Sequence, residues 1–393
     1  MNFSISYFSK GIGIPLMVLA LLYGCAQRKQ TSMRETLFVP GRDFRVAVLP
    51  VENLSGTNAP LKEFKVSLVG KMRKRGTTVI SEEDLEEFMA RHRMRYTGGI
   101  DREDARKLKE ETGADAVLIT SLELYDRIYP PKIAVSSRLV ATEGSGHRIL
   151  WMDGIGLSGD SSPRILGLGL IKDPKILAET VAENLSDSLA EYLSGFSRME
   201  GPKGRDDKFH PKMQFGFLGT EGKNGVSVAV VPFYNLSSRS NAGEIMSQHF
   251  VRHLKEYEHL SVVEPGDVRL KLLNYRVILE DGISLSNADL ISDKLQVDLI
   301  LTGRVFDYQD YRGAGGSAKV DFSVLVLDEK SRKIIWYSRS SNNGDDYVYL
   351  FDWGKLKTAH ELADQMVGRV VNSFRSQDLE GREPFAIDEL GGG

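Results

Sequence analysis

The stretch "VAVLPVENLS" at residues 46–55 governs the interpretation of this chain, because a near copy, "VAVVPFYNLS", returns at residues 228–237. Each copy opens with an apolar run typical of a buried strand and then reaches a proline, Pro50 or Pro232. Proline lacks the N–H that a central strand donates, so we expect both strands to stop there and Asn or Ser to cap the next element of the chain. A motif that occurs twice predicts a duplicated unit.

The similarity continues beyond the opening motif in the same order. Apolar residues recur at helical spacing in both copies, and a strand-length apolar run comes next, "GADAVLITSLELYD" at 113–126 and "QVDLILTGRVFDY" at 296–308. The matched positions include Asp115 with Asp298, Tyr125 with Tyr308, and Trp151 with Trp336. We expect both tryptophans to be largely buried in equivalent places.

Two alternating strands and a long amphipathic helix complete each copy. The fold class predicted from this order is α/β, a tandem duplication of an α/β sandwich domain. Each copy is expected to run strand, helix, strand, helix, strand, strand, strand, helix. Each copy also has enough strands and helices to bury a core of its own, so we expect two separate cores.

The first residues do not belong to either copy. An apolar run from Gly11 to Gly24 is too short to span a bilayer, which takes about 20 residues, but it suits the hydrophobic part of a signal peptide. Cys25 comes directly after it and is the single cysteine of the 393 residues, so it has no partner for an intramolecular disulfide.

The segment Leu22-Tyr23-Gly24-Cys25 resembles the lipobox of bacterial lipoproteins. The resemblance implies that Cys25 is lipidated after the signal is cut before it. Several acyl chains anchor a protein stably where one is marginal. Ala26 is similar to the residue found at this place in lipoproteins sent to the outer membrane. We therefore expect a protein lipid-anchored to the outer membrane and facing the periplasm.

These signals predict the domain boundaries. The linker and the tether are placed by Pro, Gly and mixed charges. The predicted parts are a lipoprotein signal peptide at 1–24, a lipidated tether at 25–43, a first domain at 44–196, a linker at 197–225, a second domain at 226–376 and a C-terminal tail at 377–393.

The strand and turn motifs of both copies, together with "HRILW" at 147–151 and "RKIIW" at 332–336, resemble an envelope domain family. This family includes the curli secretion lipoprotein CsgG, the amino-terminal domain of TolB and the peptidoglycan-synthase activator LpoB. The resemblance implies a domain that binds envelope proteins or oligomerises and that is not an enzyme. Motifs of this kind specify a fold better than an activity.

Composition excludes several other classes of function. Charged residues make up 27% of the chain, hydrophobic residues 41%, and the formal net charge is −3. These values are not typical of disorder or of a nucleic-acid-binding surface, so we expect no nucleic-acid partner. We find no phosphate loop, dinucleotide fingerprint or nucleophile elbow with the required spacing, and we therefore predict no catalytic residues and no cofactor.

A histidine pair is the best metal candidate in the sequence. His249 and His253 are four residues apart and share a helix face, with His259 nearby, as in many zinc sites. The pair corresponds to Ser67 and Lys71 in the first copy, and a lysine there indicates a face in contact with solvent. No Glu comes after His249 in the zinc-protease pattern, so we expect no metal site.

Two hypotheses for the function remain open from the sequence. The first is a non-catalytic, lipid-anchored periplasmic interaction or assembly factor, whose partners are envelope proteins and the membrane reached through Cys25. The second is an oligomeric, CsgG-like outer-membrane secretion component, and both hypotheses leave a homo-oligomer open. Tyrosine-rich loops at 307–316 and 345–353 suit protein recognition, but packing under the closing helix explains them as well.

Overall fold

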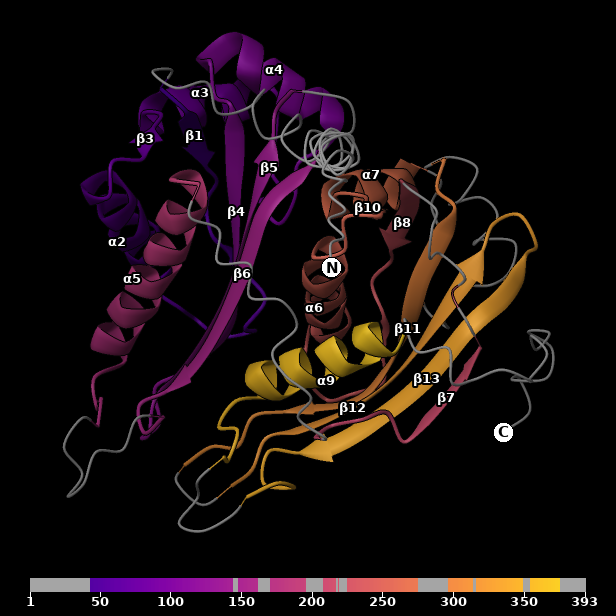
Figure 1. The fold of residues 1–393 in the computed structure, drawn as a ribbon. Coiled ribbons are helices and arrows are strands. Elements are labelled where there is room, and N and C mark those ends of the chain that lie inside the picture. The colour runs from indigo at the N-terminus through magenta and orange to yellow at the C-terminus, as the bar shows by residue number, and fades with distance from the viewer. Residues whose placement is uncertain are drawn as a thin grey trace, which may run out of the picture. The chain divides into compact units, whose positions relative to one another are not determined.

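In the computed structural model, each opening motif forms a buried parallel strand, as the sequence predicts (Figure 1). The structure describes residues 43–143, 148–161, 170–195, 208–216, 218, 225–274, 296–313, 316–348 and 354–374. The predicted signal peptide, Cys25 and the C-terminal tail lie outside the described residues.

The first repeat contains a mixed sheet with the strand order β3-β1-β4-β5-β6, in which β2 also pairs with β4. Its strands are β1 (Arg45–Val48), β2 (Glu52–Asn53), β3 (Thr78–Val79), β4 (Ala116–Asp126), β5 (Lys132–Ala141) and β6 (Ile149–Ser158). Its helices are α2 (Leu61–Lys74), α3 (Glu82–Arg91), α4 (Arg102–Thr112) and α5 (Pro174–Leu193). Strands β3, β1 and β4 run parallel, and β5 and β6 continue antiparallel.

The second repeat has the matching order β10-β8-β11-β12-β13, with β7 beyond it at the edge. Its strands are β7 (Met213–Gly216), β8 (Val226–Val230), β9 (Tyr234–Asn235), β10 (Leu260–Val262), β11 (Leu299–Gln309), β12 (Lys319–Asp328) and β13 (Lys333–Asn343). Its helices are α6 (Ala242–Lys255), α7 (Pro265–Asn274) and α9 (Ala359–Ser373). The duplication of an α/β sandwich is therefore confirmed.

The equivalent landmarks also have the environment that the sequence predicts. Trp151 is 7% exposed and Trp336 is 1% exposed, so both are buried. Asp115 accepts a hydrogen bond from the backbone N–H of Arg45, and Asp298 accepts one from Ser227, each at 2.9 Å. The two aspartates thus tie the same pair of strands together in each repeat.

The Asn-Leu-Ser segments close turns and do not cap helices, so the capping prediction is wrong. The side-chain oxygen of Asn53 accepts the N–H of Ser55 at 3.1 Å, and Asn235 accepts that of Ser237 at 3.0 Å. The prolines do interrupt β1 and β8, but the chain resumes pairing in β2 and β9. An Asx turn offers the backbone this alternative to a helix start.

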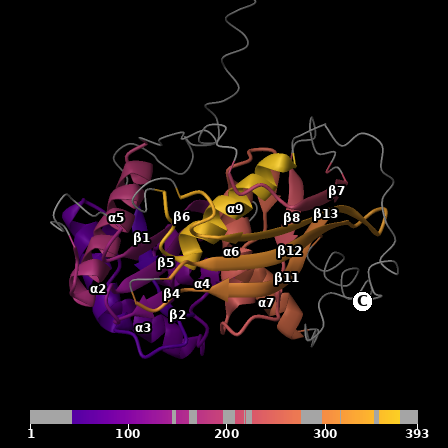
Figure 2. The same ribbon diagram turned by 90° about the horizontal axis from the view of Figure 1, so that it is seen from below.

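The burial of the strands shows how the layers are arranged. Every residue of β5 is buried, whereas burial along β12 alternates with partial exposure. Helix α5 covers one face of the first sheet, and α6 and α9 of the second repeat contact both β6 and their own sheet (Figures 1 and 2). The first sheet is therefore covered on both faces, and we call the face toward the second repeat its inner face.

One hydrophobic core crosses from the first repeat to the second. The largest cluster of buried apolar side chains includes Ile100 and Ile119 of the first repeat and Met246, Phe250 and Leu362 of the second. The expectation of a separate core in each copy is therefore met only in part: the repeats share this cluster, whereas a second cluster, which includes Val231, Val268 and Leu327, lies within the second repeat. The described residues from Arg45 onward form one compact unit, because the helices of the second repeat supply apolar surface on two sides.

The segment predicted as a linker also contributes to the second repeat. Strand β7 pairs antiparallel with β13 at the edge of the second sheet. Phe209, from the same segment, is 3% exposed, and its ring packs edge-on against that of Tyr347 with 4.8 Å between the ring centroids.

No helix within the described part of the chain is long and apolar enough to cross a membrane.

Two glycines in β6 allow α9 to approach the first sheet. A Cβ added at Gly156 would lie 2.5 Å from Thr358 Oγ1 and 3.1 Å from His360 Cβ. One added at Gly154 would lie 2.9 Å from His360 Nε2. Real Cβ atoms do not make contacts under 3.0 Å, so these positions have no room for a side chain.

We predict that Gly156→Ala lowers the free energy of unfolding by about 1–3 kcal/mol, the usual cost of overpacking, because α9 must move off β6. Urea denaturation measures this. Gly70→Ala is the matched control, because a Cβ at that site in α2 meets nothing within 4 Å. The control should gain about 0.5–1 kcal/mol, as a helix glycine replaced by alanine does. A Gly156→Ala variant as stable as the wild type would contradict the close approach.

Candidate functional site

The inner face of the first sheet carries a row of buried polar side chains. Ser121 and Glu123 alternate along β4, and Ser136 and Arg138 alternate along β5, so each pair points to one face. All four are at most 5% exposed, and Ser121 lies directly across from Ser136 in the strand register. Buried polar groups need hydrogen-bond partners, and here the second repeat supplies them.

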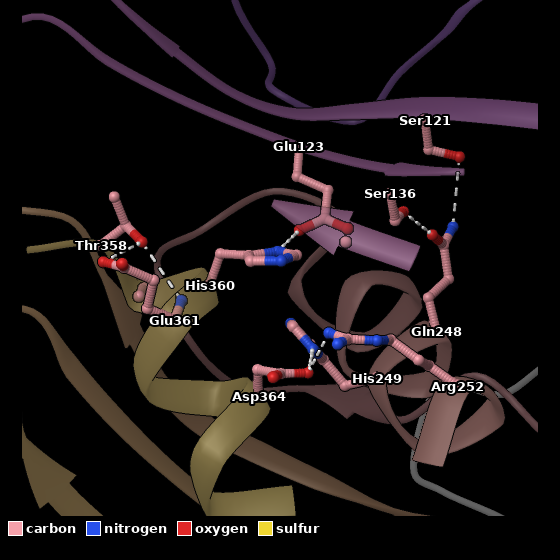
Figure 3. A network of polar contacts seen from close by, with 12 residues as sticks. Ser121, Glu123, Ser136, Gln248, His249, Arg252, Thr358, His360, Glu361 and Asp364 are labelled. Atoms are coloured by element: carbon pink, nitrogen blue, oxygen red, sulfur yellow. Dashed lines mark hydrogen bonds and ion pairs between the residues drawn. The ribbon is translucent and has the colours of Figure 1, made fainter. Parts of the chain in front are cut away.

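Gln248 of α6 binds both serines of this row (Figure 3). Its side-chain oxygen accepts from Ser136 Oγ, and its amide nitrogen donates to Ser121 Oγ at 3.3 Å. One amide thus joins β4 and β5 to the second repeat.

Arg138 forms a fully buried ion pair with Glu264, which precedes α7. Two guanidinium nitrogens donate to the two carboxylate oxygens at 3.0 Å each, and Nη2 also donates to the carbonyl of Gly98 at 2.6 Å. The side chains are 2% and 0% exposed. This bidentate geometry is what a buried charge pair requires to offset its desolvation.

Glu123 and two histidines form a second buried group, which we call the histidine cluster (Glu123, His249 and His360). His360 Nδ1 lies 2.6 Å from Glu123 Oε2, and the rings of His249 and His360 lie 4.6 Å apart between centroids. The three residues come from β4, α6 and α9, and Figure 3 shows their side chains meeting between these elements.

The charges of Glu123 and His360 shift the pKa values of both side chains. Burial disfavours the imidazolium, but the carboxylate of Glu123 outweighs it and raises the pKa of His360 above its ordinary value. Burial likewise opposes the ionised carboxylate, yet the charge and hydrogen bond of His360 lower the pKa of Glu123. Burial lowers the pKa of His249, and the carboxylate of Asp364, 3.6 Å from its Nδ1, does not offset this. The cluster thus favours one charged and one neutral imidazole.

The sequence prediction that His249 and His253 face solvent is wrong. His249 is 3% exposed, and His253 Nε2 lies 2.9 Å from Asp364 Oδ1 of α9. Arg252 donates to the same oxygen at 2.6 Å. Lys71 of the first repeat indicated a solvent-exposed helix face, but the corresponding face of α6 packs against α9 and the first sheet.

One group of three among the described residues could hold a metal ion, and it is the histidine cluster. One ligand atom from each member lies within 4.8 Å of the others. His253 and His259, the other histidines of the sequence candidate, are not in this group: the ring of His259 packs edge-on to Tyr257. Sequence spacing could not identify the group, because its members are up to 237 residues apart.

A third polar group surrounds Glu52 in the same interface. Ser121 Oγ donates to Glu52 Oε2 at 2.7 Å, and Tyr96 donates to Glu244 of α6 at 3.1 Å. Arg269 of α7 lies over the Tyr96 ring, 4.0 Å from its centroid. Burial, with a smaller contribution from Glu244, raises the pKa of Glu52 from its ordinary 4.5 to about 7.

A cavity of about 500 Å³ lies where equivalent loops of the two repeats meet. It is lined by residues 57–58 and 124–128 of the first repeat and by 238–239, 308–310 and 312 of the second. Three large apolar side chains of the loops after β4 and β11 are about half exposed, namely Ile128, Tyr129 and Tyr311. We call the cavity and these three side chains the paired-loop groove.

Some tyrosines of the tyrosine-rich loops pack inside the fold, and others are exposed to solvent. Tyr308 is 2% exposed and Tyr347 packs against Phe209, whereas Tyr311 is 49% exposed. Phe351 and Trp353 lie outside the described residues. The sequence analysis considered Tyr311 but missed Ile128 and Tyr129, for which the "RIYPP" segment at 127–131 was the available signal.

No family model and no curated protein matches the chain. Solved structures that resemble part of it include a PelC dodecamer from Paraburkholderia phytofirmans, with 16% identity and a TM-score of 0.30 over 42% of this chain and 97% of that one. Lipoprotein GNA1162 from Neisseria meningitidis has 20% identity and a TM-score of 0.26 over 37% of this chain and 99% of that one.

The C-terminal domain of LpoB from Escherichia coli has 12% identity and a TM-score of 0.24, over 32% of this chain and 89% of that chain. LpoB was among the proteins that the sequence motifs resemble, while the likeness to CsgG and to TolB stays a prediction. Likenesses at these identities and scores carry no argument about what this chain does.

We predict that Glu52→Gln removes a pH-dependent destabilisation. Because the pKa of Glu52 is raised on folding, the folded state keeps between pH 4.5 and 7 a proton that the unfolded state releases. Stability contributed by that proton is lost as the pH rises through this window, by roughly 3 kcal/mol at about 1.4 kcal/mol per pKa unit.

Urea denaturation at pH 5 and pH 8 tests this. The variant should match the wild type near pH 5 and exceed it at pH 8, since glutamine keeps an acceptor for Ser121 without a charge. Glu63→Gln, on the exposed side of α2, is the control and should behave as the wild type does at both values. An equal difference at the two pH values would show that Glu52 does not titrate with folding.

Proposed function

We propose that this chain is a lipid-anchored, periplasmic interaction or assembly factor of the bacterial envelope, and that it is not an enzyme. The observation that carries this proposal is the paired-loop groove, to which both repeats contribute the same loops. Its exposed aromatic and aliphatic side chains are of the kind that anchor protein partners, because rigid rings supply contact area at low entropic cost.

The location of the titratable groups supports a non-catalytic role. The histidine cluster and the pair of Arg138 with Glu264 are buried where the repeats meet, and each of their side chains is at most 4% exposed. A general acid or base must reach the substrate within hydrogen-bond distance. These titratable side chains therefore join the two repeats and are not accessible to a substrate.

The chemistry of the groove indicates the class of partner. Arg127 and Arg312 are exposed, one from each repeat, beside Ile128 and Tyr311. The carboxylate of Asp310 is bound inside the fold by the N–H of Ala359 at 2.7 Å. Apolar anchors flanked by exposed guanidinium groups fit a protein segment that carries apolar side chains and carboxylates.

Attachment to the membrane is proposed to depend on Cys25, with the described residues held in the periplasm by the tether at 25–43. The support is the lipobox resemblance and the adjacent Ala26, which favours the outer membrane.

We predict that Cys25→Ser, made with an ordinary cleavable signal peptide, releases a folded protein into the periplasm. Lipid chains are the anchor in this proposal, so their loss should move the protein from the membrane fraction to the soluble one. Fractionation and immunoblotting measure this, and Ser32→Ala in the tether is the control that should stay in the membrane fraction. Retention of the Cys25→Ser protein in membranes after a high-salt wash would contradict the anchor.

We predict that a photo-crosslinking amino acid at Tyr129 or at Tyr311 traps the same envelope protein in living cells. The two sites lie in equivalent loops beside one groove, so one partner should contact both. The same amino acid at Val66, which is 72% exposed on α2, is the matched control and should trap none of it. Adducts of equal yield from position 66, or none from 129 and 311, would place the partner elsewhere.

A further inference from the structure

The histidine cluster has free ligand atoms in a site closed to solvent. Glu123 Oε1, His249 Nε2 and His360 Nε2 are buried and make no hydrogen bond to any of the residues that the structure describes. The three residues are at most 3% exposed. Buried polar atoms in proteins are nearly always hydrogen-bonded, so three unsatisfied ones in one place call for an explanation.

The three residues have the ligand chemistry of a transition-metal site. Two imidazoles and one carboxylate are the protein ligands of many zinc sites, and imidazole also suits iron, nickel and copper. One ligand atom from each residue lies within 4.8 Å of the others. The carboxylate of Glu123 favours the protonated imidazole of His360, so binding of an ion releases that proton. Tetrahedral zinc at ~2.0–2.2 Å from its ligands holds them about 3.3 Å apart, so an ion would draw these atoms together by at most about 1.5 Å.

The surroundings of His249 are those of a metal ligand. Its Nδ1 lies 3.6 Å from Asp364 Oδ1, while its Nε2 makes no hydrogen bond to a described residue. Asp364 is itself held by Arg252 at 2.6 Å and by His253 at 2.9 Å. A carboxylate behind one ring nitrogen fixes the tautomer and leaves the other nitrogen to bind the metal.

We propose that Glu123, His249 and His360 bind one divalent transition-metal ion, of the zinc class, between the two repeats. Glu123 is on β4 of the first repeat, whereas the two histidines are on α6 and α9 of the second. The ion therefore fastens one repeat to the other and has a structural role. This differs from the sequence expectation of no metal, which considered His249 and His253 with His259 nearby.

The direct test uses the full-length protein, stripped of metal with a chelator under mild denaturation and refolded with Zn²⁺. Elemental analysis after dialysis should find one zinc per chain, and zinc should raise the melting temperature in a way that the chelator reverses. Co²⁺ in its place should give the visible absorption of a tetrahedral site. A wild-type protein that retains no zinc and shows no shift in melting temperature overturns the proposal.

Variants then test the ligands. Glu123→Gln and His249→Gln keep the side-chain size and should each weaken zinc binding by more than about tenfold, since even the loss of an outer partner costs 10–100-fold. His259→Gln is the matched control, because the ring of His259 packs edge-on to Tyr257 outside the cluster, and this variant should keep one zinc per chain. Zinc retained by His249→Gln as tightly as by the wild type would also overturn the proposal.

Circular dichroism shows whether each variant folds. Where a ligand variant does not fold, the stoichiometry and the melting temperature of the wild type and of His259→Gln decide the question. The result does not depend on the proposed function, because zinc binding by the purified protein requires neither the lipid anchor nor a partner.

Discussion

The buried ion pair between Arg138 and Glu264 is the constraint on which the rest of the structure depends. The two side chains are 2% and 0% exposed, so neither charge is solvated by water. Removing one partner of such a pair typically costs about 3–5 kcal/mol, because the remaining charge stays buried. The first sheet therefore cannot hold Arg138 on its inner face unless the second repeat is docked there.

The two repeats share a fold but no longer share an environment. In the strand register, the position that is Glu123 in the first repeat is Phe306 in the second, and Arg138 corresponds to Leu325. Phe306 and Leu325 are half-buried, whereas Glu123 and Arg138 are buried. The duplication thus supplies the same scaffold twice, and at these two described positions the first copy carries buried charges that need partners.

The sequence was sufficient for the fold because its evidence was local and repeated. The helix that begins after Asp101 and the burial of Trp336 result from caps and apolar spacing that each copy carries within itself. The candidate site could not be found in this way. Ser136 and Arg138 are two residues apart in a strand, the spacing also expected of residues that face solvent, and segments more than 100 residues away supply the partners that bury them.

The histidines show a limit of comparing one repeat with the other. Lys71 and His253 occupy equivalent helix positions, yet Lys71 pairs with Glu183 of its own repeat, whereas His253 binds Asp364 beside the inner face. An internal comparison assumes that equivalent positions have equivalent neighbours. That assumption fails for α6, since α6 lies between two sheets.

The long separation between Glu123 and His360 has a consequence for the order of folding. The two residues are 237 positions apart, and α9 is the last helix of the described chain. A chain synthesised from its amino end presents β4 and β5 well before α9. Until α9 is present, the buried charge of Glu123 lacks its partner His360, and contacts this distant in sequence form slowly. The first repeat therefore stays incomplete while the chain folds, and its inner face is a defined surface for chaperones to protect until the last described helix docks.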